Sequence, residues 1–185
     1  MVDGKERTDS VYHIIPAFRF INQNGDTITE KSFNNKIYVA DFFFSTCPSM
    51  CPKMMTQMNR VMAAEQNIND LMILSHSVNP EHDSVPVLAE YAKRVHADGK
   101  KWMLVTGIKK EIYDIAMEGY KLPISEDPRE PGGFLHTSLF VLVDKERRIR
   151  GYYDGIDSSE VNTLINDINI LSAEYKTERT SSKTH

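Results

Sequence analysis

The sequence lacks the features that would indicate a membrane span or a nucleic-acid surface. No apolar stretch approaches the roughly 20 residues that cross a bilayer. The longest, Ile37–Phe44, contains Asp41 and has the length of a strand. No run of Lys and Arg exceeds two residues, and 22 basic against 26 acidic residues give a formal charge of −4. We therefore expect the chain as given to be soluble and to have no nucleic-acid partner.

Cysteine is also scarce, because the 185 residues include only two, too few for a disulfide framework. A domain of this length buries roughly 70% of its unfolded surface and needs no such framework to fold. The two cysteines nevertheless lie four residues apart, as Cys47 and Cys51, in the segment Cys-Pro-Ser-Met-Cys. This spacing is the most informative feature of the sequence.

The hydrophobic pattern alternates between strands and helices, which predicts an α/β fold with parallel central strands. A front β-hairpin is expected because Asn24-Gly25 separates two alternating segments. The predicted strands are 17–21, 27–29, 37–44, 71–74, 102–105, 137–143 and 148–153. The predicted helices start near Met50, Ser84, Ile108 and Asp157, and the last one ends at Leu171.

These elements divide the chain into three predicted parts. A flexible N-terminal segment covers 1–12, a single globular domain covers 13–172, and a mobile polar tail without hydrophobic period covers 173–185. Within the domain, 122–135 contains three prolines and two adjacent glycines. We expect a long surface loop there, of the kind that often carries function.

The cysteine spacing has a chemical interpretation. Cys47 follows a predicted strand, and Cys51 lies where the next helix starts. Residues four apart face the same side of a helical turn, and helix N-termini stabilise thiolates. Two thiolates at this separation can close into a disulfide or chelate one soft metal ion. The alternative is a pair of inert, buried cysteines.

A copper site requires a third ligand besides two thiolates, and imidazole suits this role. Of six histidines, His136 is the best candidate, because it follows a glycine-rich loop and precedes a core strand whose start should lie near the cysteines. The alternative for His136 is a strand-edge histidine bonded to a loop carbonyl. The others fall in predicted tails, in solvated segments or inside a strand: His13, His185, His82, His96 and His76.

Three segments, in order along the chain, resemble the Sco/SenC family. Residues 43–52 look like its Cys-x-x-x-Cys-Pro metal loop, and 77–83 are similar to its Ser-x-Asp-Pro-x-x-Asp stretch. His136-Thr137-Ser138 resembles its late histidine. The resemblance covers roughly Pro16 to Leu171.

The resemblance implies a thioredoxin-like fold with an N-terminal β-hairpin insertion and a central mixed sheet flanked by helices. It also implies one copper ion, Cu(I) or Cu(II), held by Cys47, Cys51 and His136. The expected function is that of a metallochaperone, which delivers copper to the copper centre of cytochrome c oxidase or maintains its thiols. The expected partner is the copper-bearing subunit of that oxidase or another copper protein. Three positions depart from the family's usual residues: Asn79, Leu135 and Ser49.

The expected location also follows from the resemblance, because members of the family are usually tethered in the cell envelope. Met1–Ser10 is polar and lacks the apolar core of a signal peptide. We therefore expect a monomer at the periplasmic face of a membrane, with its anchor outside the given sequence.

Three other functions remain open. A thiol-disulfide oxidoreductase of thioredoxin type would use Cys47 to attack and Cys51 to resolve, although such enzymes have Cys-x-x-Cys and a proline where His136 stands. A peroxide-reducing enzyme has no evident use for His136. A binding module without metal or redox chemistry would leave all three residues unexplained. Met50 is a candidate weak extra ligand, whereas the other methionines of its helix suit core packing.

Overall fold

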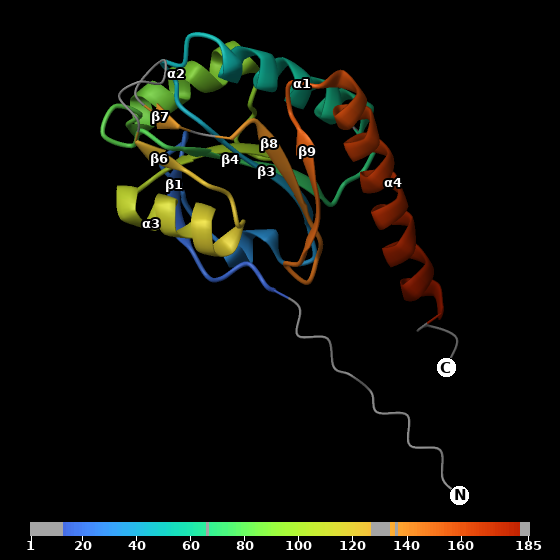
Figure 1. The fold of residues 1–185 in the computed structure, drawn as a ribbon. Helices are drawn as coiled ribbons and strands as arrows, with labels where there is room; N and C mark the ends of the chain where they lie inside the picture. The colour runs from blue at the N-terminus through green and yellow to red at the C-terminus, as the bar shows by residue number, and fades with distance from the viewer. Residues whose placement is uncertain (1–12, 66, 127–133, 136, 182–185) are drawn as a thin grey trace, which may run out of the picture.

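Seven strands form one mixed sheet, in the order β2-β1-β5-β4-β3-β8-β9. The computed structural model describes residues 13–65, 67–126, 134–135 and 137–181 (Figure 1). The three central strands run parallel: β3 (Ile37–Phe43), β4 (Leu71–Ser77) and β5 (Trp102–Thr106). The outer strands pair antiparallel: β1 (Arg19–Asn22), β2 (Thr27–Thr29), β8 (Leu139–Val143) and β9 (Ile149–Asp154).

The two innermost strands are buried along their whole length. Every residue of β3 and β4 is buried, which explains the dense β-branched and aromatic composition of β3. Their register pairs Ile37 with Leu71 and Phe43 with Ser77. The carboxyl ends of both strands therefore lie at the same edge of the sheet, where the segments after them can form a site.

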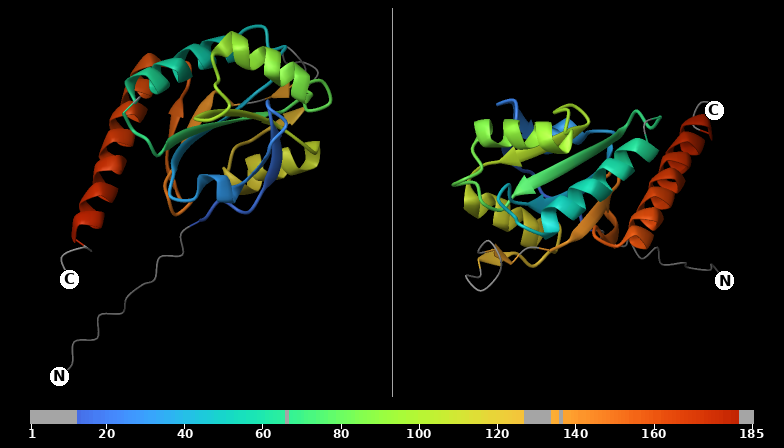
Figure 2. Two further views of the ribbon diagram at one scale, coloured as in Figure 1. Left: turned by 180° about the vertical axis from the view of Figure 1, so that it is seen from behind. Right: turned by 90° about the horizontal axis from the view of Figure 1, so that it is seen from above.

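Helices cover both faces of this sheet (Figures 1 and 2). On one face lie α1 (Met50–Ala64) and α2 (Val85–Val95), while α4 (Ser158–Ser181) packs beside α1 and along β9. The opposite face carries α3 (Lys109–Asp114), continued by the π-helical turn η2 (Ile115–Gly119). None of the helices among the described residues combines the length and the apolar character that a bilayer crossing needs.

Three short elements complete the described fold. A 3-10 turn, η1 (Glu30–Phe33), follows the front hairpin. The strands β6 (Ser125–Glu126) and β7 (Phe134–Leu135) form a separate antiparallel pair. This pair lies within the segment predicted to be a long loop.

The α/β fold with a mixed sheet, a front hairpin and flanking helices is confirmed. The predicted end of the last helix at Leu171 is wrong, because α4 continues through Ser181. Contacts with the segment between β8 and β9 hold this extension. The Tyr175 hydroxyl donates to the Glu146 carboxylate, and the Lys145 ammonium lies 4.8 Å from the centre of the Tyr175 ring. Tertiary contacts therefore support a helix that the local pattern does not indicate.

Candidate metal centre

The two cysteines lie at the carboxyl edge of the sheet, Cys47 on the connection from β3 to α1 and Cys51 at the start of α1. This connection, residues 44–49, is here called the cysteine loop. Met50 is the first residue of α1, and Pro52 falls in the first turn, where its missing N–H breaks no helical bond. Cys51 therefore sits in the first turn of the helix, as the sequence predicted, and Cys47 sits in the loop before it.

The structure brings the two thiols together. The Cys51 backbone N–H donates to Cys47 Sγ at 3.3 Å, and the Cys47 N–H donates to the Phe44 carbonyl at 3.1 Å. Cys51 is fully buried, whereas Cys47 is half-buried. The hydrogen bond with Cys47 and the burial of the side chain both raise the pKa of the Cys51 thiol. A ligand that binds Cys51 as a thiolate therefore displaces its proton.

His136, the predicted third ligand, lies outside the described residues. The strand that follows it is described: β8 runs antiparallel to β3, with Val141 opposite Ala40. In this register the start of β8 lies at the carboxyl end of β3, the end that leads into the cysteine loop. Among the described residues, no three Cys, His, Asp or Glu side chains are grouped so that they could hold a metal ion.

Two other histidines are placed clearly. His76, assigned from sequence to a strand, is fully buried in β4, stacks on Phe42 and has its Nδ1 3.2 Å from the Asp41 carbonyl oxygen. Burial lowers the pKa of His76 to about 4. His76 is therefore a core histidine, as its place inside a predicted strand implied, and its Nε2 is buried without a hydrogen-bond partner among the described residues. His82 is half exposed, yet its Nδ1 lies 2.9 Å from a carboxylate oxygen of Asp83.

The methionines of α1 confirm the core-packing interpretation. Met54, Met55 and Met58 are buried in the hydrophobic core. Met50 is partly buried and packs against the same core. The helix therefore uses its thioether side chains mainly to fill irregular apolar space beneath the cysteine loop.

Asp83 also lies near the cysteine loop, although the sequence alone indicated no role for it. It is fully buried and accepts hydrogen bonds from Ser45, at the beginning of the cysteine loop, and from Ser77, at the end of β4. The spacing between Ser77 and Asp83 was visible as a motif. The sequence could not show that Asp83 bonds to Ser45, because Ser45 lies 38 positions earlier in the chain.

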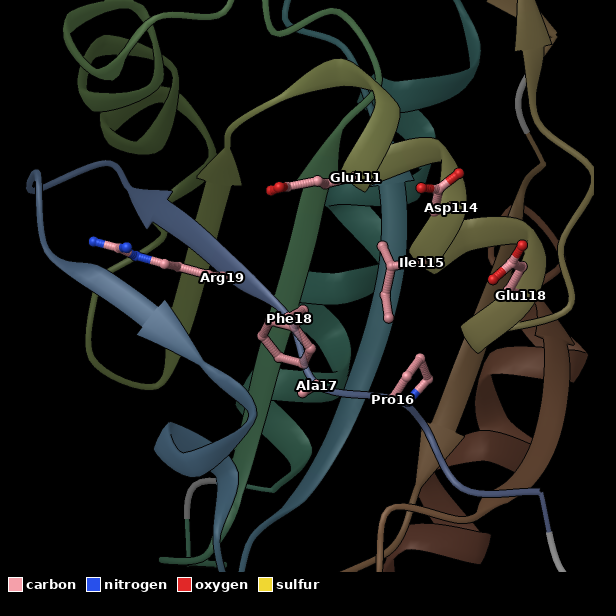
Figure 3. A pocket seen from close by; sticks show the side chains of 8 residues that line it. All are labelled: Pro16, Ala17, Phe18, Arg19, Glu111, Asp114, Ile115 and Glu118. Atoms are coloured by element: carbon pink, nitrogen blue, oxygen red, sulfur yellow. The ribbon is translucent and has the colours of Figure 1, made fainter.

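Two surface hollows differ in their relation to the cysteines. One, of about 850 Å³, is lined by Ser45 and Thr46 of the cysteine loop together with His82 and residues along α2 from Pro86 to Arg94. The other, of about 480 Å³, lies between residues 16–19 and α3, with three carboxylates projecting from the helical side (Figure 3). No residue of the cysteine loop lines it, and its donors are hard oxygens, which do not suit a soft metal.

A family model described as SCO1/SenC matches residues 6–171. The chain belongs to the SCO1/SenC family. The SCO1 protein homolog of Bacillus subtilis is 30% identical over 169 residues, which cover 89% of this chain and 86% of that protein. The resemblance seen in the three sequence motifs is therefore confirmed.

Solved structures of Sco proteins share this fold. A SCO1/SenC family lipoprotein from Bacillus anthracis is 26% identical with a TM-score of 0.79, covering 88% of this chain and 96% of that one. BsSco, a member of the Sco family of cytochrome c oxidase assembly proteins in which a disulfide switch was identified, is 27% identical with a TM-score of 0.75, covering 89% and 96%. Arabidopsis thaliana ScoI with copper bound is 23% identical with a TM-score of 0.70, covering 84% and 98%. The thioredoxin-like Sco fold is thus confirmed for this chain.

Proposed function

We propose that this chain is a copper-binding metallochaperone of cytochrome c oxidase assembly. One copper ion per chain would be held by Cys47, Cys51 and His136. The protein would deliver this ion to the copper-bearing subunit of the oxidase, maintain the thiols of that copper centre, or do both. Copper is the cargo in this proposal, and the cysteine loop is the site that loads and releases it.

The observation that carries the proposal is the pairing of two thiols at one helix start. Soft thiolates favour Cu(I), and two of them supply most of the bonding to that ion. The 3.3 Å hydrogen bond from the Cys51 N–H to Cys47 Sγ keeps the sulfur of Cys47 over the first turn of α1. Deprotonation of both thiols is required before copper binds, so loading releases protons.

The assignment of His136 as the third ligand rests on its place in the chain. It lies three residues before Leu139, where β8 begins beside the carboxyl end of β3. An imidazole at this end of the sheet would add a nitrogen donor, which Cu(II) prefers more strongly than Cu(I) does. This ligand set would allow one site to hold both oxidation states.

Relatives support the nature of the cargo and the process. Copper is bound in the structures of ScoI from Arabidopsis thaliana and from Bradyrhizobium japonicum. BsSco belongs to a family of cytochrome c oxidase assembly proteins. The Bacillus anthracis relative is a lipoprotein, which supports a location in the cell envelope with a membrane anchor.

A second candidate function is thiol-disulfide exchange, favoured by the unequal exposure of the two thiols. Cys47 is half-buried and Cys51 fully buried. The Cys47 thiolate would attack a partner disulfide and release one partner thiolate. Cys51, after losing its proton, would then attack Cys47 Sγ, form the intramolecular disulfide and release the second partner thiolate. The disulfide switch identified in BsSco is consistent with such a cycle.

Anaerobic titration of wild type and His136→Ala with Cu(I) and Cu(II) distinguishes the two functions. We expect the variant to retain much of the Cu(I) binding and to lose most of the Cu(II) binding, together with the thiolate-to-copper absorption band. His96→Asn is a matched control, because His96 is an exposed residue in the left-handed region (φ 62°), which asparagine also adopts. If His136→Ala keeps wild-type Cu(II) binding and spectrum but loses disulfide reductase activity, the oxidoreductase function replaces the copper proposal.

A further inference from the structure

A buried carboxylate holds the beginning of the cysteine loop. Asp83 is fully buried, and hydrogen bonds from four groups converge on its two oxygens. Oδ2 accepts from the Ser45 backbone N–H at 3.0 Å and from Ser77 Oγ at 2.5 Å. Oδ1 accepts from Ser45 Oγ at 2.5 Å and from His82 Nδ1 at 2.9 Å. Hydrogen bonds to an ionised acceptor are about twice as strong as those between neutral groups.

These bonds connect the cysteine loop to the end of β4 and to the segment before α2, which lie more than 30 residues later in the chain. Ser45 is the second residue of the cysteine loop and lies two residues before Cys47. Ser77 ends β4, and Asp83 directly precedes Ser84, the N-cap of α2. At the carboxyl ends of β3 and β4, the Val78 N–H donates a backbone hydrogen bond to the Phe43 carbonyl at 2.8 Å. Beyond Phe43 the chain leaves the sheet. There the backbone N–H and the hydroxyl of Ser45 both donate hydrogen bonds to the Asp83 carboxylate.

We propose that Asp83 is a positioning residue, which fixes the cysteine loop at Ser45 and thereby holds Cys47 over Cys51. This inference rests on the proposed function in that the held thiols are the proposed copper ligands. Chelation and disulfide formation both require two sulfurs at a defined separation. A loop that is already ordered loses less conformational entropy when either bond forms. Asp83 therefore strengthens both the dithiolate site for copper and the disulfide that competes with it.

The test has a measurement that needs no copper. Wild type and variants are equilibrated with mixtures of reduced and oxidised dithiothreitol, in which the protein disulfide takes two electrons and two protons from the dithiol and returns cyclic disulfide. The ratio of protein disulfide to dithiol gives the midpoint potential of the cysteine pair. Cu(I) affinity, by competition with a chelator, and Tm are measured on the same samples.

We expect Asp83→Ala to make the protein disulfide about tenfold less stable, which raises the midpoint potential by about 30 mV. Its Cu(I) affinity should fall by a similar factor. Ser45→Ala removes one of the four bonds, so it should shift both quantities in the same direction by a smaller amount. Asp83→Asn should restore most of the wild-type values, because its amide oxygen can still accept from the Ser45 N–H, while its NH₂ group can donate to Ser45 Oγ.

A buried polar residue at another position separates positioning from general loosening. Gln23 is buried and bridges the Trp102 carbonyl (3.2 Å) and the Leu104 N–H (2.9 Å) on β5, away from the cysteine loop. Gln23→Ala should therefore lower Tm without moving the midpoint potential. If Gln23→Ala shifts the potential as much as Asp83→Ala does, the positioning role is wrong.

A folded Asp83→Ala protein with the wild-type potential and Cu(I) affinity would overturn the proposal. If Asp83→Ala does not fold, the Ser45→Ala variant takes its place in the test. A wild-type midpoint potential in Ser45→Ala would then overturn the proposal. Failure of the proposed function is distinguishable from failure of this inference. A wild-type protein that binds no copper contradicts the metallochaperone, whereas the potentials still report whether Asp83 positions the cysteine pair.

Discussion

Two buried aspartates, Asp41 within the sheet and Asp83 beyond its edge, accept hydrogen bonds from serines of β4 but differ in what they hold together. On β3, Asp41 accepts a hydrogen bond at 2.5 Å from Ser75 of β4, and Ser75 Oγ in turn accepts from Trp102 Nε1 of β5 at 3.0 Å. Asp83 accepts at 2.5 Å from Ser77, two residues further along β4. The Asp41 cluster joins three neighbouring strands inside the sheet. The Asp83 cluster joins the last residue of β4 to two segments that lie outside the sheet. The Asp41 cluster therefore stabilises the sheet, whereas the Asp83 cluster stabilises the cysteine loop.

This comparison predicts that changes in the sheet interior alter stability, whereas changes around the cysteine loop alter copper and disulfide chemistry. His76 belongs to the interior, because its Nδ1 donates to the Asp41 carbonyl and its ring lies among Phe20, Phe42 and Tyr120. Because burial lowers its pKa to about 4, His76 gives the largest expected change in the free energy of unfolding.

Stability should fall between pH 6.5 and pH 4 because of His76. Burial lowers its native pKa from 6.5 to about 4, so in this range the unfolded chain takes up a proton that the native chain excludes. The full contribution is present above pH 6.5, and about 3 kcal/mol is lost by pH 4. Urea denaturation of wild type and His76→Phe across this range measures it. The variant should show a flatter pH dependence, and equal slopes in the two proteins would show that His76 does not titrate in this way.

The serine pair on β4 gives the next effect and tests the comparison directly. Ser75→Ala leaves the buried Trp102 N–H without its acceptor and removes a donor to Asp41, so we expect a loss of about 2 kcal/mol in the free energy of unfolding. Ser77→Ala should cost about 1 kcal/mol, because Asp83 keeps its bonds from Ser45 and His82. Denaturant unfolding of both variants measures these two losses in the free energy of unfolding. A larger loss for Ser77→Ala would reverse the assignment of the two clusters.

The end of α4 lies outside both clusters and gives the smallest effect. Tyr175→Ala removes the hydroxyl bond to Glu146 and the contact of the ring with Lys145, which we expect to cost about 0.5 to 1 kcal/mol. Circular dichroism should show a small loss of helical signal, since these contacts hold the helical turns beyond Leu171. Unchanged helical content would mean that these contacts do not support the extension.

The sequence was a good guide where local pattern decides the structure. The buried runs around Val39 and Ile73 predicted the central strands, and Asn24-Gly25 predicted the front hairpin. The predicted helix start near Met50, directly after a predicted strand, correctly placed Cys51 at a helix start. The cysteine pair at the sheet edge followed from these elements. Its part in copper binding stays a prediction, as does the assignment of His136, which lies outside the described residues.

The sequence was a poor guide where distant contacts decide. The helical turns after Leu171 depend on Tyr175 meeting the segment between β8 and β9, which no periodicity encodes. His82 is exposed, as its predicted solvated position implied, but the sequence did not predict its bond to Asp83 or its position 3.4 Å from Ser45 Oγ. The role of Asp83 depends on a loop 38 residues earlier in the chain. Each of these features depends on contacts between segments far apart in sequence, which only the folded chain brings together.

Cu(I) titration of the reduced protein, with a Cys47→Ser, Cys51→Ser double variant beside it, tests the central claim most directly. Under anaerobic conditions and with a competing chelator, wild type should bind one Cu(I) per chain, because two soft thiolates supply most of the bonding. The double variant should bind none stoichiometrically while keeping its fold by circular dichroism, since hydroxyl oxygens are poor ligands for this ion. A folded double variant that still binds one Cu(I) per chain with wild-type affinity would contradict the copper site at Cys47 and Cys51.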